Sequence, residues 1–427
     1  MPSNPSPTGR PDTPAEAART ARPPRPGRVP AATSAAPPRV LHVVQPVTGG
    51  VPQVVLDLIR QHLTAPDAPR VLVACPEQGP LAGWVTAAGA DWLRWDATRS
   101  PGTALPSEIR ALARLIARTR PGLVHAHSAK AGLAARLALR GRVPTVFQPH
   151  AWSFEAVEGT AARLARRWEA GGARWAARIV CVSEAERATG EAAGVRARWT
   201  VVPNGVDTDR FRPEPPAHDV LPRARRAPHD APPALAGTDP HAPLVVCVAR
   251  LCRQKGQDVL LRAWPEILRR VPGARLALVG DGPDGERLRA GSPEGVIFAG
   301  AAEDPAPWYR AADLVVLPSR WEGMALAPLE AMACGRPVLL TDVAGARESL
   351  APGHRAYCLV PPGEPAALAR AAAGLLLDAP RRAALGAQGR RHVLTTHDVR
   401  QSARAVAAVY RDILGAERPK CRESTTS

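Results

Sequence analysis

The sequence predicts an α/β protein made of two doubly wound units, each built on a parallel sheet. From residue 39 onward, short apolar runs alternate with amphipathic stretches, the pattern of βαβ units. A segment with nine prolines, residues 213–243, interrupts this alternation, which resumes at residue 244. With 427 residues, the chain is long enough for two domains. We therefore expect two α/β domains joined by a proline-rich linker.

The expected strands follow from the apolar runs and the turn residues between them. In the first half they cover residues 40–44, 71–74, 123–126, 145–148, 179–182 and 200–202. In the second half they cover residues 244–248, 276–279, 296–298, 314–317 and 338–340. A last helix is expected from the helical spacing of Val399, Ala403, Val406, Tyr410 and Ile413.

These elements set the expected domain boundaries. Residues 1–38 are expected to form a disordered extension rich in Pro and Arg, and residues 417–427 a disordered tail. Between them we expect a first domain (39–212), the linker (213–243), a second domain (244–396) and a C-terminal helix (397–416).

Composition favours a cytoplasmic protein. No apolar run approaches the roughly 20 residues that span a bilayer. The proline-rich first 38 residues contain no apolar core of a signal peptide. The seven cysteines form no CxxC pair, and most lie in strand-like runs, which indicates reduced thiols in the core.

The charge distribution points to an anionic partner. The formal net charge is +17, and residues 99–178 contain 14 basic and four acidic residues. Such a face suits a membrane surface, a phosphorylated substrate or nucleic acid. The alternative interpretation is a solvated, arginine-rich surface. Because no stacking motif or helix-turn-helix signal is present, we expect no nucleic-acid partner.

Two motifs have a structural interpretation that outweighs the functional one. The segment from Gly280 to Gly285 matches GxGxxG, but it follows the second strand of its half, so a tight turn is the better interpretation. Asp207 and Asp209 could bind a divalent cation, but they follow a turn signal at the edge of the linker, and two surface carboxylates are the better interpretation. No His/Cys cluster has zinc spacing, and no metal site is expected.

The strongest constellation lies in the second half. Arg250 follows a buried strand, and Lys255 precedes a helix. A later strand ends at a Pro-Ser turn, and a helix is expected to begin near Met324 or Ala325 with Glu322 just before it. The free N–H groups of that helix and the two cations would stabilise a diphosphate leaving group. One core helix with two solvated glutamates is the alternative, but it leaves the two basic residues unexplained.

In this order and spacing, the motifs resemble those of the retaining glycosyltransferases of family 4. The resemblance covers residues from about 39 to 416. Its carriers are Gly49-Gly50, Pro149-His150, the run from Pro203 to Asp207, the run from Arg250 to Gly256, the turn from Gly280 to Pro283, and the pair Glu322 and Glu330. It implies the GT-B fold, in which two Rossmann-like domains have parallel sheets facing a central cleft. It also implies a nucleotide-diphosphate sugar as donor substrate and no cofactor.

The resemblance also implies roles for individual residues. Arg250 and Lys255 would bind the diphosphate, Glu322 the donor-sugar hydroxyls and Glu330 the ribose, with His150 approaching the sugar and Gly50 the phosphates. Gly323, Met324, Ala325 and Leu326 would complete the donor site. The catalytic set would be His150, Arg250, Lys255 and Glu322. The sequence departs from the family at Ala151 and Ala325, where glycine is common, and at Met324, where phenylalanine is common.

The run from His125 to Gly132 resembles a subset of the family that assembles exopolysaccharide and lipopolysaccharide. We therefore expect an anionic or lipid-linked acceptor, bound by His127, Ser128 and Lys130. Lys130 is expected in the first turn of a helix over 129–140, where a cation is unfavourable unless an anion binds there. The alternative is that the histidines are satisfied at a strand end and that Lys130 points to solvent.

Peripheral contact with an anionic membrane, at the inner face of the plasma membrane, is expected from residues 160–178. On a helical wheel, Leu164, Trp168 and Trp175 lie together, beside a sector of four arginines, Arg163, Arg167, Arg174 and Arg178. A face packed on the sheet is the alternative.

The sequence as a whole predicts a retaining, metal-independent glycosyltransferase that acts in cell-surface polysaccharide synthesis. The alternatives are a nucleotide-sugar epimerase or phosphorylase of the same fold, and a nucleic-acid-binding protein.

Overall fold

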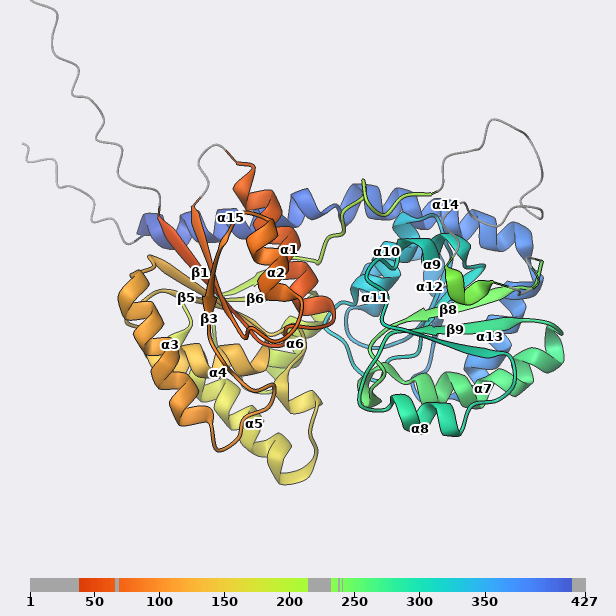
Figure 1. Ribbon diagram of the computed structural model, residues 1–427, viewed down its shortest axis with the longest axis horizontal. Coiled ribbons are helices and arrows are strands. Elements are labelled where there is room, and N and C mark those ends of the chain that lie inside the picture. The colour runs from red at the N-terminus through yellow and green to blue at the C-terminus, as the bar shows by residue number, and fades with distance from the viewer. Residues whose placement is uncertain (1–37, 66–68, 214–231, 237–238, 240, 417–427) are drawn as a thin grey trace, which may run out of the picture. The chain divides into compact units, whose positions relative to one another are not determined.

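A computed structural model describes residues 38–65, 69–213, 232–236, 239 and 241–416. The expected extension up to residue 37, most of the expected linker and the tail from residue 417 lie outside the described residues. Within the described part, the chain forms a seven-stranded and a six-stranded sheet (Figure 1). Every pairing between the named strands is parallel, which confirms the predicted α/β class.

The first sheet has the strand order β3-β2-β1-β4-β5-β6-β7. Its strands are β1 Arg39–Val44, β2 Arg70–Cys75, β3 Asp91–Arg94, β4 Leu123–His127, β5 Thr145–Gln148, β6 Arg178–Cys181 and β7 Trp199–Val201. The helices of this domain are α1 Gly50–Leu63, α2 Leu81–Ala87, α3 Leu105–Thr119, α4 Ser128–Leu139, α5 Gly159–Gly172 and α6 Glu184–Ala192. Single 3₁₀ turns are η1 Ser153–Glu155 and η2 Ala173–Trp175.

The second sheet has the strand order β10-β9-β8-β11-β12-β13. Its strands are β8 Leu244–Val248, β9 Arg275–Val279, β10 Val296–Gly300, β11 Leu314–Leu317, β12 Val338–Thr341 and β13 Leu359–Val360. The helices are α7 Gln257–Arg270, α8 Gly285–Ala290, α9 Ala306–Ala311, α10 Leu326–Ala333, α11 Ala346–Ser349, α12 Arg355–Cys358, α13 Pro365–Leu377, α14 Ala379–Thr396 and α15 Val399–Ala416. The 3₁₀ turns are η4 Pro233–Leu235, η5 Arg253–Lys255 and η6 Pro352–His354.

Alternate residues of β1 supply two separate cores. Leu41 and Val43 pack with residues of α3 and α4 on one face of the sheet. Val44 packs with residues of α1 and α2, which cover the other face (Figure 1). This alternation follows from the period-two geometry of a strand. It places His42, between Leu41 and Val43, on the side of α1.

The last helix, α15, belongs to the core of the first domain although it ends the described chain. Val406, Tyr410 and Ile413 are buried in it. The imidazole of His62 on α1 hydrogen-bonds to the Ala403 carbonyl over 3.1 Å. The Tyr410 hydroxyl lies 2.6 Å from Nδ1 of His125 on β4. Since Asp412 also pairs with Arg178, polar contacts hold α15 along much of its length.

Two short strands, β3 and β13, were not expected from the sequence. Both lie at an edge of their sheet, where pairing on one side alone extends them. β3 has the sequence DWLR, and β13 has two residues. Neither segment has the run of β-branched residues on which a strand prediction depends.

The cysteines and the helices agree with the expectations from composition. Six cysteines among the described residues are free and buried, and Cys421 lies outside the described residues. None of the described helices is long and apolar enough to cross a membrane.

Replacing Tyr410 with Phe should destabilise the protein by about 1–3 kcal/mol, because Nδ1 of His125 would lose its partner in a fully buried position. Denaturant unfolding measures the difference. Tyr357→Phe is the control, since Tyr357 is 46% exposed and should change stability by less than about 0.5 kcal/mol. Equal stability of Tyr410→Phe and wild type would contradict the packing described here.

Candidate functional site

The second sheet reverses its strand order between β8 and β11. From β8 the chain continues to β9 and β10 on one side, and then crosses to β11 on the other side of β8. Such a switch point opens a crevice at the carboxyl ends of the strands. The loop after β8 carries Arg250 and ends in η5, which contains Lys255. The loop after β11 carries Ser319 and Glu322. The topology therefore brings together residues about 70 positions apart, as the sequence predicts.

Lys255 and Glu322 form an ion pair at this edge. Nζ of Lys255 lies 2.5 Å from Oε1 of Glu322, and the side chains remain 20% and 10% exposed. The Ser319 hydroxyl donates to the same carboxylate oxygen over 2.7 Å. Ser319 and Glu322 also line a pocket with Ala325, at the end of the same loop. The Lys255–Glu322 pair is thus partly exposed, and the hydrogen bond from Ser319 holds the Glu322 carboxylate in place.

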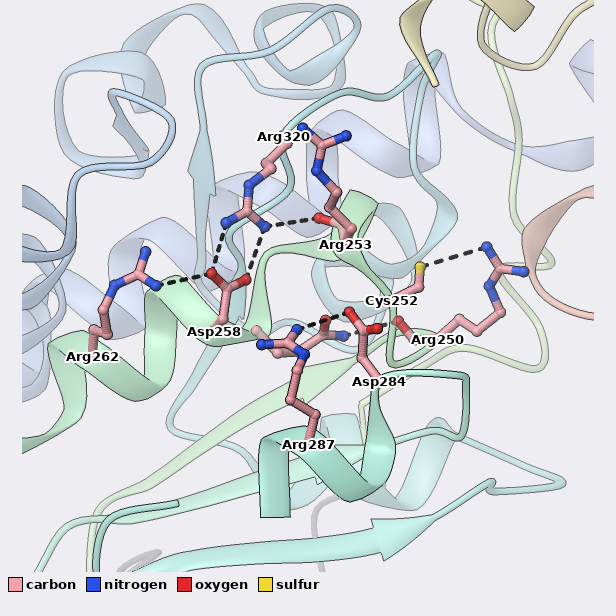
Figure 2. A network of polar contacts seen from close by, with 9 residues as sticks. Arg250, Cys252, Arg253, Asp258, Arg262, Asp284, Arg287 and Arg320 are labelled. Carbon is pink, nitrogen blue, oxygen red and sulfur yellow. Dashed lines mark hydrogen bonds and ion pairs between the residues drawn. The ribbon is translucent and has the colours of Figure 1, made fainter. Parts of the chain in front are cut away.

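Arg250 differs from the arginines around it because it has no carboxylate partner among the described residues. Its guanidinium contacts the Sγ atom of Cys252 over 3.5 Å (Figure 2). The neighbouring arginines of this network are paired: Arg262 and Arg320 with Asp258, and Arg287 with Asp284. Arg250 is therefore a cation without a carboxylate partner among the described residues, in the loop that leads from β8 to Lys255.

Arg99, from the loop after β3, is a second cation of this region and was not singled out from the sequence. Burial, and next the positive charge of Arg250, lower the pKa of Arg99. Its proximity to Arg250 depends on a contact between loops 150 residues apart, for which the sequence contains no local signal. Two guanidinium groups that repel one another form a site that an anion would stabilise.

The GxGxxG segment is a structural turn, as expected. A Cβ atom on Gly280 would lie 2.1 Å from the Ala249 carbonyl oxygen, and one on Gly282 would lie 2.2 Å from that of Leu251. These glycines allow the turn after β9 to pack against the backbone on either side of Arg250. Their role is to fix the arginine loop, so the sequence needs no dinucleotide site to explain them.

Helix α10 begins at Leu326, one or two residues later than expected. Ala325 is its N-cap residue in an extended conformation (φ −73°, ψ 142°), which an alanine adopts without strain. The departure from glycine at this position therefore costs nothing in the backbone. The helix start lies beside the first domain, since a Cβ atom on Gly50 would be 4.0 Å from Cδ1 of Leu326.

Glu330 lies in the second turn of α10 and is buried. Oε2 accepts a hydrogen bond from the Tyr309 hydroxyl over 2.6 Å. Burial raises the pKa of Glu330 to about 7, while the Tyr309 bond opposes this shift. Oε1 accepts no hydrogen bond from the described residues, so it is available to a hydroxyl group of a ligand.

The carboxyl edge of the first sheet holds three strained residues. Ser128 (φ 73°), His150 (φ 58°) and Ala151 (φ 125°) follow β4 and β5 and have positive φ without being glycine. Such strain is retained at functional sites when the surroundings impose it. Ala151, where the family often has glycine, adopts a backbone conformation that favours glycine.

Glu186 on α6 holds this strained loop and was not anticipated. Its two carboxylate oxygens accept the backbone N–H groups of Ala151 and Val182, each over 2.7 Å. Burial raises the pKa of Glu186 to about 7, and the two N–H bonds oppose this. A sequence signal is present in the Ser183 N-cap of α6, but the partner of Glu186 lies 35 residues away.

Gly323 lies at the contact between the loops that contain the two expected donor-sugar residues, Glu322 and His150. A Cβ atom on Gly323 would lie 2.9 Å from Oε1 of Glu186 and 3.0 Å from the carbonyl carbon of His150. The Ser183 hydroxyl donates to the Gly323 carbonyl over 3.1 Å. The Asn204 side-chain amide donates to the Met324 carbonyl over 2.8 Å. The loop containing Glu322 therefore packs directly on the loop containing His150.

Three buried histidines lie beneath this loop, and one of them hydrogen-bonds to His150 of the loop itself. His42, His125 and His127 are fully buried and lie on paired strands, with His42 opposite His125 in the register. Nδ1 of His42 lies 3.0 Å from Nε2 of His127, and Nδ1 of His127 lies 3.2 Å from Nε2 of His150. Burial lowers the pKa of His42 and of His150 to about 3. All four rings are therefore neutral near pH 7.

The structure buries Lys130 in an ion pair within the first domain, which argues against its expected acceptor role. The residue lies in the first turn of α4, as expected, but its side chain is 2% exposed. Its ammonium group pairs with Glu108 on α3 over 2.5 Å and donates to the Ser100 carbonyl over 3.1 Å. The positive charge is thus neutralised within the first domain. His127 is also fully buried, and Ser128 alone of the three expected acceptor residues is partly exposed.

The arrangement of residues 160–178 differs from the expected single amphipathic face. Helix α5 ends at Gly172, and Trp175 lies in the 3₁₀ turn that follows. Trp168 is half-buried against Arg136 and Trp175. Leu164 is 70% exposed beside exposed arginines. Leu164, Arg163, Arg167 and Arg174 are therefore exposed, whereas the tryptophans are half-buried. Arg178 begins strand β6 and pairs with Asp412 instead of joining the exposed face.

Asp207 and Asp209 show the structural role that the turn suggests. The Asp207 carboxylate accepts the N–H groups of Asp209 and Arg210, each over 3.0 Å. Asp209 pairs with Arg400. The two carboxylates thus have separate partners.

Comparison with known proteins extends these observations. Residues 48–210 match the family model described as Glycosyltransferase Family 4, and residues 242–378 match the model described as Glycosyl transferases group 1. The chain belongs to the family 4 glycosyltransferases. The residues matched include the strained loop, the arginine loop and the Glu322–Glu330 segment.

Curated relatives of this family 4 protein include two mannosyltransferases. It is 36% identical over 226 residues to the lipopolysaccharide core biosynthesis mannosyltransferase LpsB of Rhizobium meliloti, a match that covers 50% of this chain and 61% of the relative. It is 39% identical over 215 residues to a GDP-mannose-dependent phosphatidylinositol monomannoside mannosyltransferase of Mycobacterium tuberculosis, covering 47% of this chain and 52% of the relative. The matched region thus spans between half and three fifths of these relatives.

Solved structures share the fold. The Anabaena protein HepE, in complex with UDP and glucose, has a TM-score of 0.72 at 22% identity, covering 88% of this chain and 100% of that chain. A sucrose-phosphate synthase from Thermosynechococcus elongatus has a TM-score of 0.71 at 21% identity, covering 89% of this chain and 100% of that chain. These similarities support the GT-B fold that the motifs imply.

Gly323→Ala should lower stability by about 1–3 kcal/mol, because the added methyl group would overlap Glu186 and the His150 backbone. Thermal or denaturant unfolding measures this. Gly374→Ala on α13 is the matched control, since its Cβ atom would meet no atom within 4 Å and should leave stability equal or higher. If both variants are as stable as wild type, the two loops are not in contact.

Lys130→Met should destabilise the protein by about 3–5 kcal/mol, because Glu108 would remain as a buried, unpaired charge. Adding Glu108→Gln to this variant should recover part of the loss, and denaturant unfolding of both variants provides the comparison. A stable Lys130→Met protein would show that the ion pair is absent and would restore the acceptor role.

Proposed function

We propose that this chain is a retaining glycosyltransferase that transfers a sugar from a nucleotide-diphosphate donor to a lipid-linked glycan acceptor. The observation that carries the proposal is that the unpaired guanidinium of Arg250 and the Lys255–Glu322 pair lie on the loops that follow β8 and β11, at the carboxyl ends of these neighbouring strands. A site that concentrates unpaired positive charge, next to a carboxylate for hydroxyl groups, suits a sugar diphosphate. The family membership supports the same reaction class.

The chemistry depends on stabilising the leaving group. When the bond between the anomeric carbon and the diphosphate oxygen breaks, negative charge develops on the diphosphate. Arg250, Lys255 and the N–H groups at the start of α10 would stabilise this charge, and preorganised donors of this kind act more strongly in the transition state than in the ground state. Lys255 would bind a phosphate in place of Glu322. The Glu322 carboxylate would then be free to accept hydrogen bonds from sugar hydroxyls.

The other site residues have roles that fit their surroundings. His150 is neutral and partly exposed, so it can hydrogen-bond a sugar hydroxyl without carrying charge. Oε1 of Glu330 can accept a ribose hydroxyl, with Gly50 beside the start of α10. In a front-face mechanism, transfer with retention requires no nucleophile on the second face of the sugar. The cations that stabilise the leaving group therefore supply most of the catalytic effect.

The acceptor class rests on the relatives and on the first domain. One relative is named for lipopolysaccharide core synthesis and another for a phosphatidylinositol mannoside. Ser128 is strained and partly exposed at the carboxyl end of β4, where an acceptor hydroxyl would approach. A lipid-linked glycan fits an enzyme that works next to a membrane surface.

Donor binding provides the direct test, with UDP, GDP, UDP-glucose and GDP-mannose as probes in a thermal-shift panel. A probe at 100 times its dissociation constant should stabilise the fold by about 2.7 kcal/mol. Arg250→Gln should weaken diphosphate binding about 10–100-fold, because a charge-assisted contact contributes about 1.5–3 kcal/mol. Arg287→Gln, on the neighbouring α8, is the control and should bind like wild type, since Arg287 is paired with Asp284.

Two results would contradict the proposal. One is the absence of stabilisation by every probe. The other is turnover of a bound donor that releases no nucleoside diphosphate when a polyprenyl-diphosphate glycan is supplied, which would indicate an epimerase.

We also propose that the exposed part of α5 contacts anionic lipid. Replacing Arg163 and Arg167 with Gln should reduce co-sedimentation with phosphatidylglycerol vesicles, since each basic residue near the surface contributes about 1 kcal/mol. The matched control replaces Arg110 and Arg114, two exposed arginines of α3, with Gln. Equal binding by both variants, or equal binding to neutral vesicles, would contradict this contact.

A further inference from the structure

The proposed function assigns no role to the hydrogen bonds that link His42, His127 and His150. We propose that His42 and His127 are positioning residues that hold His150 in the tautomer with its proton on Nδ1. This inference rests on the proposed function, since His150 is the residue expected to meet the donor sugar. It concerns two fully buried side chains, which cannot touch a ligand themselves.

The geometry forms a continuous chain. Nδ1 of His42 faces Nε2 of His127 over 3.0 Å, and Nδ1 of His127 faces Nε2 of His150 over 3.2 Å. The ring planes are inclined by 9° for the first pair and by 27° for the second, as expected for bonds made near the ring plane. Strand pairing fixes the positions of His42 and His127. In the register of β1 and β4, His42 lies opposite His125, and Val44, two residues further along β1, lies opposite His127.

In a chain of neutral imidazole rings, every hydrogen bond runs in the same direction. Burial lowers the pKa of His42 and His150 to about 3, and that of His127 well below its usual value. A neutral ring has one N–H donor and one acceptor nitrogen. If one ring in the chain changes tautomer, the others must change with it, so the three tautomers form a single two-state unit.

The two ends of the chain decide which state is preferred. At the inner end, Nε2 of His42 is buried and has no hydrogen-bond partner among the described residues. At the outer end, His150 is partly exposed and can reach water or a ligand. Since one end must carry an N–H group and buried N–H groups without acceptors are rare, the proton belongs at the outer end. His42 then donates to His127, and His127 donates to Nε2 of His150.

A metal ion is the other occupant to consider for this cluster. Ring nitrogens of His42, His125 and His127 lie within 4.8 Å of one another, close enough for ligands of one ion. However, His42 and His127 already share a hydrogen bond over 3.0 Å. No carboxylate of the described residues contacts these rings, so nothing would neutralise a buried divalent charge. The hydrogen-bonded chain accounts for the geometry more fully.

The consequence is a fixed donor at the active site. With Nε2 occupied by the bond from His127, Nδ1–H of His150 is the group available to a sugar oxygen. The strained φ of 58° at His150 and the Glu186 bond to Ala151 hold the loop in which this donor sits. Without the chain, His150 would sample both tautomers and would present an acceptor nitrogen part of the time.

The first experiment reads the tautomer directly. Long-range ¹⁵N–¹H correlation spectra of the histidine-labelled full chain, in which His150→Gln identifies the His150 signals, show which nitrogen carries the proton. We expect Nδ1–H in wild type and in His42→Asn, whose side-chain amide still donates to His127. His42→Leu should show a mixture or Nε2–H. A wild-type His150 protonated on Nε2 would overturn the proposal, whether or not the His42 variants fold.

The second experiment measures turnover with UDP-glucose or GDP-mannose, whichever stabilises the protein. His42→Leu should lower kcat about tenfold, equivalent to about 1.4 kcal/mol, with a smaller change in KM. His42→Asn should restore kcat to within about threefold. His125→Leu is the control, because His125 is equally buried on the same sheet face but bonds to Tyr410 outside the chain.

The outcomes separate this inference from the proposed function. Equal loss of kcat in His42→Leu and His125→Leu would show a merely structural role and overturn the inference. Failure of wild type to bind any probe would overturn the proposed function, whereas the tautomer of His150 would still decide the inference. Stoichiometric zinc retained after purification would replace the chain with a metal site.

Discussion

The candidate donor site depends on Arg250, an arginine without a counter-ion among the described residues. Acidic side chains neutralise the other arginines of its polar network, and Asp258 alone pairs with two of them, Arg262 and Arg320 (Figure 2). Placing a guanidinium in a half-buried position without such a partner is costly unless something else supplies the negative charge. The turn glycines at 280 and 282 pack against the loop on both sides of this arginine, so the loop cannot easily move to relieve the charge.

The second constraint is the contact between the two donor-sugar loops. Gly323 has no room for a side chain because Glu186 and the His150 backbone lie against it. Glu186 in turn fixes Ala151 in a backbone conformation that favours glycine. The result is that Glu322 on one loop and His150 on the other are held at defined positions before a ligand arrives. Preorganisation of this kind is what makes electrostatic stabilisation effective.

Local sequence patterns predicted most of the fold and about half of the site. Apolar runs located the central strands because strands buried on both faces are continuous hydrophobic segments, as in Leu244–Val248. Arg250, Lys255 and Glu322 could be associated because they follow strands whose carboxyl ends meet at one edge. Edge strand β3 lacked that signal. Arg99, Glu186 and His42 gained their importance from contacts between distant segments, which no spacing in the sequence encodes.

For Lys130, by contrast, the sequence predicts a role in ligand binding that its buried ion pair argues against. Its position at a helix start predicts an anion ligand, but Glu108 on the adjacent helix offsets the unfavourable interaction with the helix dipole. The pairing depends on how α3 and α4 pack, and the sequence separation of 22 residues conceals it. A cation at a helix start therefore indicates a ligand only when no neighbouring element supplies a carboxylate.

The most direct measurement of the central claim compares nucleosides with their diphosphates by isothermal titration calorimetry. If unpaired cations at the carboxyl edge of the second sheet form the binding site, UDP or GDP should bind at least about 100-fold more tightly than uridine or guanosine, a difference of about 2.7 kcal/mol. This advantage should shrink as salt concentration rises. Equal affinities for the nucleoside and its diphosphate would contradict the account.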